Sequence, residues 1–116
     1  MGATLSKEER LCGKTAIDNL VHKGRWGGFG HLKYCTVSNE GAELNRILVS
    51  VPKKYFKRAV KRNLLKRRMR EAYRTQKELL GTKGHDLMLV YSSPEVAPYS
   101  TIREEVASIL EKMNPA

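Results

Sequence analysis

The chain has 116 residues, of which 41% are hydrophobic, and its 22 Lys or Arg against 12 Asp or Glu give a formal net charge of +10. This length predicts a single domain, 1–116, whose core needs no disulfide or metal. No apolar run approaches the roughly 18 residues that span a bilayer, and the N-terminus lacks the apolar stretch of a signal peptide. Two cysteines and three scattered histidines indicate neither a disulfide framework nor a metal site. We therefore expect a reduced, cytoplasmic protein with no membrane contact.

The N-terminal half of the chain predicts one helix and two strands. The helix runs over 14–23, with apolar residues on one face and Gly24 placed to end it. The segment GRWGGFG, 24–30, is too rich in glycine for a regular element and is predicted to be a mobile loop. Strands are predicted at 31–38 and 46–51, and the short link between them favours a hairpin.

The C-terminal half predicts a long helix over about 57–80, a strand at 86–91 that is apolar on both faces, and a final helix near 101–113. The element order is then α-β-β-α-β-α. This order predicts an α+β two-layer sandwich, in which helices cover a small mixed sheet.

The positive charge of the chain is concentrated in one segment. Residues 53–74 hold eleven Lys or Arg and a single acid, Glu71, so this segment carries the whole formal excess. A charge that only served solubility would be dispersed over the surface. Its concentration on one element is typical of a protein that binds a polyanion.

On a helical projection the long helix separates into an apolar side and a basic side. The apolar side consists of Leu65, Met69, Ala72, Tyr73, Gln76, Leu79 and Leu80. The opposite side, which we call the basic ridge, consists of Asn63, Lys66, Arg67, Arg70, Arg74 and Lys77. Arg68 lies between the two sides and is predicted to pair with Glu71, three residues further on.

The simplest interpretation of a charged helix face is that it keeps the helix in solution. A solvated face normally alternates signs, because like charges four residues apart repel. The ridge instead places Lys66 before Arg70 and Arg70 before Arg74, with no acid between them. Arginine, whose guanidinium forks onto two phosphate oxygens, outnumbers lysine here, which favours a phosphate polymer as the ligand.

Residues 49–74, VSVPKKYFKRAVKRNLLKRRMREAYR, resemble the signature region of the bacterial ribonuclease P protein subunit family. The motif of that family reads R-N-x-x-K-R-x-x-R-E-x-x-R. It is matched here by Arg62, Asn63, Lys66, Arg67, Arg70, Glu71 and Arg74. The strand and lysines that precede the motif match at 50–54, and the order of elements matches over nearly the whole chain.

The resemblance implies the RNA-binding protein subunit of ribonuclease P, a ribonucleoprotein endoribonuclease of tRNA processing. In that family the RNA subunit, with Mg²⁺, hydrolyses the bond that releases the 5′ leader of precursor tRNA. The protein would then have no catalytic residue and no metal site, and no obligate protein partner is predicted. By motif position, the residues expected to bind the RNA subunit are Lys53, Lys54, Arg58, Lys61, Arg62, Asn63, Lys66, Arg67, Arg70 and Arg74. Asn63 is alternatively a plain surface asparagine.

The resemblance also implies a cleft, formed by the sheet and the first helix, that binds the single-stranded leader. We expect Ile17, Val21 and Tyr34 there. Family members commonly carry phenylalanines at the first two positions, so this chain lacks two rings on which bases stack at about 1–3 kcal/mol each. Trp26 and Phe29 lie close by in sequence. Tyr34 is alternatively a core residue, and the two aliphatic residues form the cleft floor.

Three other functions share the basic helix. A ribosomal or other structured-RNA-binding protein would lack any preference for leader-bearing precursor tRNA. A major-groove DNA reader would need a zipper heptad or a helix-turn-helix, neither of which is evident. A membrane-surface helix would need an exposed apolar face, but here the apolar face of the helix is expected to pack on the sheet.

The family resemblance further implies a left-handed β-α-β crossover, although such units are right-handed in about 98% of cases.

Overall fold

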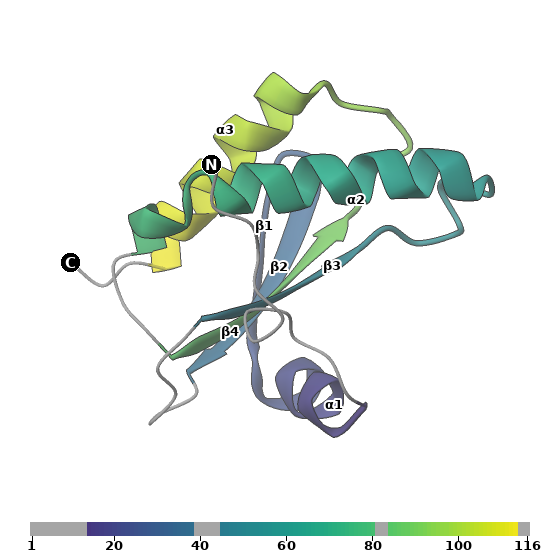
Figure 1. Cartoon of the computed structure of the whole chain (residues 1–116). Coiled ribbons are helices and arrows are strands. Elements are labelled where there is room, and N and C mark those ends of the chain that lie inside the picture. The colour runs from purple at the N-terminus through teal and green to yellow at the C-terminus, as the bar shows by residue number, and fades with distance from the viewer. Residues whose placement is uncertain (1–13, 39–44, 81–83, 114–116) are drawn as a thin grey trace.

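A computed structural model describes residues 14–38, 45–80 and 84–113. Its elements in chain order are α1 (Lys14–Lys23), β1 (Arg25–Phe29), β2 (Leu32–Ser38), β3 (Arg46–Ser50), α2 (Ala59–Arg74), the 3₁₀ helix η2 (Lys77–Leu80), β4 (His85–Tyr91) and α3 (Tyr99–Met113). The four strands form one sheet in the order β1-β2-β4-β3, as Figure 1 shows. The predicted α+β class with a small mixed sheet is confirmed.

The strand order corrects the predicted hairpin. β2 and β3 do not pair with each other, because β4 lies between them, antiparallel to β2 and parallel to β3. β4 is buried along most of its length. A strand that is apolar on both faces is most stable in the centre of a sheet, with neighbours on both sides. The short link between β2 and β3 permitted a hairpin but did not require one.

The β3, α2 and β4 elements form a β-α-β unit whose two strands are parallel and adjacent. This connectivity agrees with the order predicted from the sequence. The left-handed sense of the crossover stays a prediction of the family resemblance.

The glycine-rich segment is a strand, which corrects the predicted mobile loop. β1 pairs with β2 through Trp26–Cys35 and Gly27–Tyr34. Gly27 is required by packing: a Cβ there would lie 2.5 Å from the ring of Tyr34. Gly30 closes the connection with a φ of +62°, a left-handed conformation that glycine adopts without strain.

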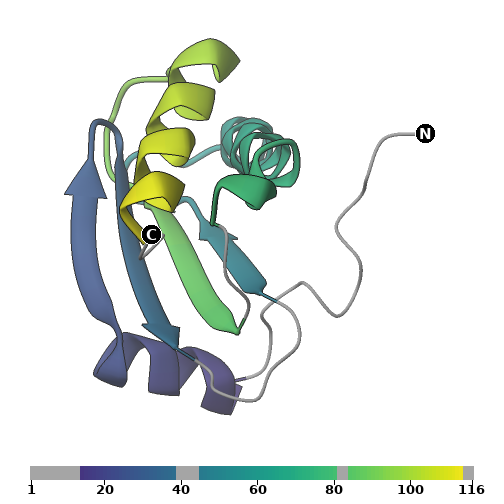
Figure 2. The same ribbon diagram turned by 90° about the vertical axis from the view of Figure 1, so that its left-hand side faces the viewer.

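Side chains alternate between the two faces of the sheet, and each face has its own apolar cluster. The larger cluster, on what we call the α2/α3 face, includes Leu65, Tyr73, Leu89, Ile102 and Ile109. The smaller cluster, on what we call the α1 face, is built on Leu20, Cys35 and Met88. The predicted two-layer arrangement therefore describes the sheet with α2 and α3, while α1 packs on the opposite face through Leu20. Figure 2 shows α1 lying across the lower ends of the strands.

The long helix ends earlier than predicted. α2 stops at Arg74, and η2 follows after a break at Thr75 and Gln76. The Thr75 hydroxyl donates back to the carbonyl of Glu71 at 2.9 Å. The buried Gln76 side chain donates to the carbonyls of Ala72 and Arg103, each at 2.9 Å, which ties the end of α2 to α3.

Candidate nucleic-acid interface

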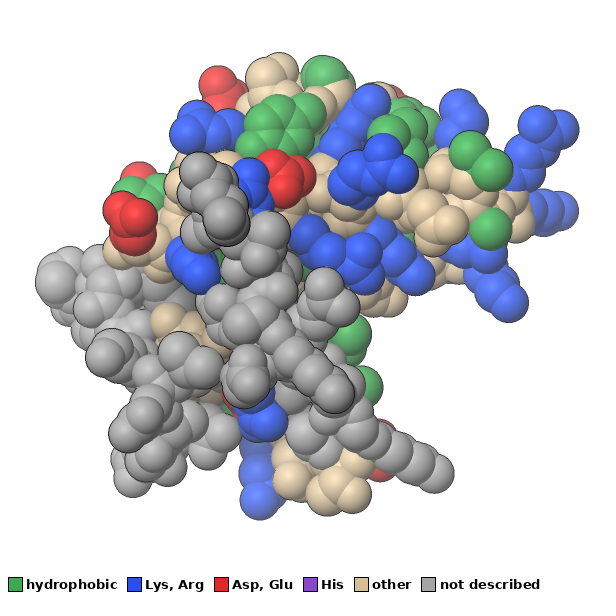
Figure 3. Space-filling view, in the orientation of Figure 1, with side chains coloured by type: hydrophobic (Ala, Val, Ile, Leu, Met, Phe, Trp, Pro, Cys, Tyr) green, Lys and Arg blue, Asp and Glu red, His purple; other side chains and the backbone are tan. Residues whose placement is uncertain are grey.

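α2 has a buried side and a basic side, as the projection predicted. Its buried residues are Leu65, Met69, Ala72 and Tyr73. Lys and Arg side chains cover much of the opposite, visible side of α2 in Figure 3. The helix therefore displays cations on a support that is fixed by core packing.

The centre of the basic ridge has no internal neutralisation. Arg67 and Arg70 are exposed and Lys66 is half-buried. Within the described part of the chain, these three side chains make no hydrogen bond or ion pair. Like charges four residues apart on a helix destabilise it by roughly 0.2–0.5 kcal/mol per pair. An anion bound along the ridge would remove this repulsion.

The single acid of the basic segment has a different partner from the one predicted. Arg74, not Arg68, binds Glu71: its Nε and Nη2 donate to the two carboxylate oxygens at 2.8 Å each. These hydrogen bonds hold the pKa of the Glu71 carboxyl below its ordinary value. Arg68 instead donates from Nη1 to the carbonyl of Ala97, in the segment that precedes α3, at 2.6 Å. The charge of Arg74 is therefore partly compensated within the protein.

The start of α2 is unusually cationic. Arg58 occupies the N-cap with an extended backbone and makes no side-chain cap, and no acid lies in the first turn. Lys61 is exposed one turn later. The unpaired N–H groups and the helix dipole favour an anion at this end, which the added cations reinforce. The exposed Lys53 and Lys54 lie in the turn that leads into it.

Arg62 has a structural role that the sequence did not indicate. Its Nη1 donates to the carbonyls of Phe56 and Lys57, at 2.8 and 2.7 Å. These bonds hold the approach segment against the first turn of α2. Asn63, the next residue of the motif, is exposed.

The three residues predicted for the leader site do not lie together. Ile17 and Val21 are on α1, and Val21 is 39% exposed. Tyr34 belongs to the α2/α3 face, where it packs against the larger core cluster. The next residue, Cys35, is the one that faces α1, where its Sγ donates to the carbonyl of Leu20 at 3.2 Å. Alternation along β2 is the physical reason for the separation.

The strand at 25–29 sorts the two neighbouring aromatic residues onto opposite faces. Trp26 pairs with Cys35, which places it on the α1 face, and it is 52% exposed. Phe29 pairs with Leu32 on the α2/α3 face, where the Nζ of Lys112 lies 4.9 Å from its ring centroid. Only a strand assignment for the glycine-rich segment could have revealed this from the sequence.

A pocket of about 490 Å³ opens between α1 and the ends of β2, β3 and β4. Its lining includes Asn19 and Lys23 from α1 and Val37 from β2. Arg46 and Asp86 also line it, and Arg46 donates to both carboxylate oxygens at 2.8 and 2.7 Å. Arg46 is thus a pocket residue that the sequence reasoning missed, although its charge is balanced.

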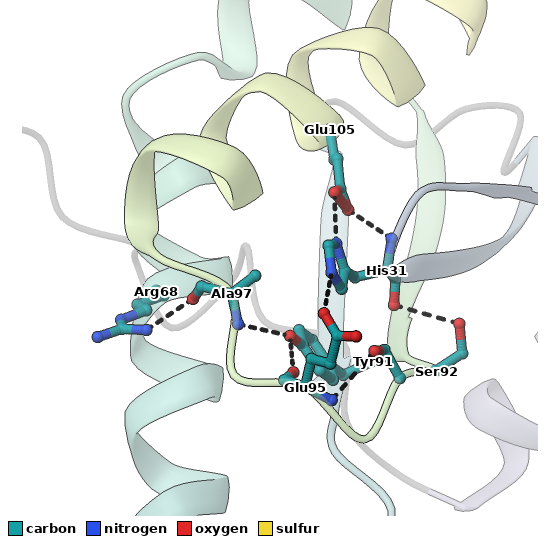
Figure 4. Close-up of polar contacts among 8 residues, drawn as sticks. His31, Arg68, Tyr91, Ser92, Glu95, Ala97 and Glu105 are labelled. Carbon is teal, nitrogen blue, oxygen red and sulfur yellow. Dashed lines mark hydrogen bonds and ion pairs between the residues drawn. The ribbon is translucent and has the colours of Figure 1, made fainter.

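A cluster of His31, Tyr91, Ser92, Glu95 and Glu105 is the arrangement closest to a catalytic group (Figure 4). The His31 ring and backbone N–H contact the buried Glu105 carboxylate at 2.8 and 2.7 Å. The hydroxyl of Ser92, however, donates to the backbone carbonyl of His31 at 3.2 Å and not to its ring. The hydroxyl of Tyr91 is bonded to the backbone of Glu95. The cluster joins the β1–β2 turn, the end of β4 and α3, which is a structural role.

The described ranges also bear on three other possibilities: a reactive thiol, a metal site and a membrane-spanning helix. Burial raises the pKa of the Cys35 thiol, which disfavours the reactive thiolate. No three His, Cys, Asp or Glu residues of the described ranges are grouped so as to hold a metal ion. Within the same ranges, no helix has the length and apolar character needed to cross a membrane.

Comparison with known proteins identifies the family of the chain. The sequence model of the family described as Ribonuclease P matches residues 5–114. The chain is 45% identical over 78 residues to the ribonuclease P protein component of Porphyromonas gingivalis, and the aligned region covers 66% of this chain and 57% of that protein. It is 32% identical over 117 residues to the ribonuclease P protein component of Petrotoga mobilis, and the aligned region covers 97% of each of the two proteins. The chain thus spans little more than half of the first relative and nearly all of the second.

Two solved structures share the fold. The RNase P protein of Staphylococcus aureus superposes with a TM-score of 0.78 at 22% identity, over 90% of this chain and 94% of that one. The RNase P protein of Thermotoga maritima superposes with a TM-score of 0.78 at 25% identity, over 90% of this chain and 96% of that one. The arrangement of α2 on the sheet is therefore a shared architecture.

Proposed function

The chain belongs to the ribonuclease P protein family, and we propose that it is the RNA-binding subunit of a ribonucleoprotein that removes the 5′ leader from precursor tRNA. The observation that carries the proposal is the uncompensated centre of the basic ridge, Lys66, Arg67 and Arg70, on a helix fixed by its buried side. Such a surface binds phosphates without having to reorganise first. We propose the cytoplasm as its location.

The RNA subunit is the proposed ligand of the ridge and of the cationic start of α2. If about six side chains neutralise phosphates, affinity should fall by roughly a thousandfold between 50 and 200 mM salt. The structure divides the motif residues into two groups. Lys66, Arg67 and Arg70 are available for phosphate, whereas Arg62 and Arg74 also hold parts of the protein together.

The α1 face is the proposed site of the single-stranded leader. Ile17 and Val21 border it from α1, and the exposed Trp26 lies on the same face of the sheet. Trp26 provides a flat ring that the two aliphatic residues lack. Lys23, which lines the adjacent pocket, supplies a cation for the leader backbone. This assignment replaces Tyr34 with Trp26.

A matched pair of variants tests the leader site. Trp26→Ala should weaken the binding of leader-bearing precursor tRNA by about 5- to 150-fold, the equivalent of one stacking contact. Affinity for mature tRNA, which has no leader, should stay unchanged. Phe29→Ala removes an aromatic ring from the opposite face and serves as the control. Equal losses for precursor and mature tRNA in Trp26→Ala would contradict the assignment.

We propose that the bond is cut by the RNA subunit and that Mg²⁺ is bound there. The protein would bind and position RNA only. This division of roles is consistent with the His31 cluster, whose polar groups are used in hydrogen bonds between elements.

Reconstitution tests the function. Purified protein is added to a bacterial catalytic RNA at low Mg²⁺, and removal of the leader from precursor tRNA is measured. The protein should stimulate the reaction, and Arg67→Ala should lose most of the stimulation while Arg103→Ala, on α3, keeps it. Binding to structured RNA with no stimulation would instead identify a ribosomal or other structured-RNA-binding protein. Cleavage by the protein without RNA would refute the proposed division of roles.

A further inference from the structure

A second pocket, of about 320 Å³, lies on the α2/α3 face near the end of α3. Its lining includes Arg25, Trp26, Tyr34, Thr36, His85, Lys112 and Met113. It shares no lining residue with the pocket on the α1 face and contains none of the ridge residues. Trp26, which is assigned above to the leader site, also lines this pocket, so the two sites adjoin at that residue.

The charged groups of this pocket are cations. Arg25 and Lys112 are both exposed, and no Asp or Glu is among the lining residues. The Nζ of Lys112 lies 4.9 Å from the ring centroid of Phe29, which holds this ammonium group over β1. Two cations from separate elements that converge without a carboxylate favour an anionic ligand.

The pocket also has an aromatic wall and a polar group without a partner. Tyr34 packs directly against the backbone of Gly27, where a Cβ would lie 2.5 Å from the ring. The glycine therefore fixes the position of the ring. The hydroxyl oxygen of Thr36 is buried and has no hydrogen-bond partner in the described part of the chain. Buried polar atoms are normally satisfied, and a ligand with a donor or acceptor could complete this one.

We propose that this pocket binds a nucleoside monophosphate unit. Its phosphate would contact Arg25 and Lys112, its base would lie against the ring of Tyr34, and its ribose or base would hydrogen-bond the hydroxyl of Thr36. The same chemistry is offered by a free nucleotide and by an unstacked nucleotide of RNA.

NMR titration of the isotope-labelled full chain tests the site. AMP should shift the backbone amides of Thr36, His85 and Met113, and inorganic phosphate should bind there at least several-fold more weakly. Lys112→Met, which keeps the length of the side chain, should weaken AMP binding by about fivefold, the effect of one exposed charge contact. Arg103→Met, which removes an exposed cation of α3 that lines neither pocket, is the matched control and should leave AMP binding unchanged.

A second arm distinguishes the two sources of the ligand. A short oligouridylate that shifts the same amides with higher affinity than UMP identifies RNA as the source, whereas weaker binding than UMP identifies a free nucleotide. The proposal is overturned if AMP shifts only residues of α2 or the α1 face. It is equally overturned if phosphate alone matches AMP in affinity, or if Lys112→Met binds AMP as the wild type does.

Discussion

Arg67 and Arg70 provide the most direct perturbation of the basic ridge. Both side chains are exposed and neither bonds to another part of the described chain, so their removal should leave the fold intact. We expect the double variant Arg67→Ala, Arg70→Ala to unfold at the same urea concentration as the wild type. Any change in RNA binding then reports contacts to RNA.

The size of the effect follows from counterion release. Each phosphate neutralised on a duplex makes affinity vary with about the −0.9 power of salt concentration. When salt is lowered from 1 M to 0.1 M, one phosphate contact therefore raises affinity about eightfold and two contacts raise it about 60-fold. The double variant should bind the RNA subunit about 60-fold more weakly at 0.1 M salt, with a slope of log affinity against log salt that is shallower by about 1.8.

Filter binding of the RNA subunit from 0.1 to 0.5 M salt measures both quantities. Arg103→Ala is the control, because it removes an exposed arginine from α3. Its affinity and slope should stay close to those of the wild type. The reasoning is refuted if the double variant loses affinity but keeps the wild-type slope, because the lost interaction would then not be with phosphate.

Three further predictions concern the groups that shape the two surfaces. Gly27→Ala forces a Cβ to within 2.5 Å of an aromatic ring and should lower the free energy of unfolding in urea by about 1–3 kcal/mol, whereas Gly28→Ala, whose Cβ meets its nearest atom at 3.6 Å, should not. Arg62→Met loses the hydrogen bonds to the carbonyls of Phe56 and Lys57 and should lower the free energy of unfolding in urea by about 1–3 kcal/mol. Unchanged stability would mean that these two hydrogen bonds do not form. Because the pKa of Glu71 is lowered on folding, its stabilising effect is present at neutral pH and is lost as pH falls through the folded pKa. The stability difference between wild type and Glu71→Gln should therefore shrink from pH 7 to pH 3, and a constant difference would contradict the ion pair.

The sequence was most informative where one pattern had one structural solution. The alternation of apolar and basic residues in α2 predicted its buried side, with Leu65 and Met69 fully buried. A helix of this kind buries its apolar side, here against α3 and the sheet, so the basic side had to face outward. The family motif lies on that helix, and its outer position followed from the helical period alone.

The rest depended on tertiary contacts that no local pattern encodes. The two glycines of β1 led to the prediction of a loop. The need for Gly27 arises from the ring of Tyr34 on the next strand, which the local sequence does not reveal. Tyr34 was expected at the leader site from the family resemblance, and its position on the α2/α3 face could not be foreseen because the face of a strand residue is fixed only by register. The partner of Glu71 was decided by the segment between β4 and α3, which supplies the Ala97 carbonyl that engages Arg68.

The reactivity of individual lysines tests most directly whether RNA covers α2. Amine modification of the full chain, read by mass spectrometry with and without saturating RNA subunit, compares Lys61 and Lys66 on α2 with Lys33 on β2. The account predicts that both α2 lysines react several-fold more slowly in the complex, while Lys33 is unaffected by the RNA subunit alone. Unchanged reactivity of Lys61 and Lys66 in a saturated complex would contradict it.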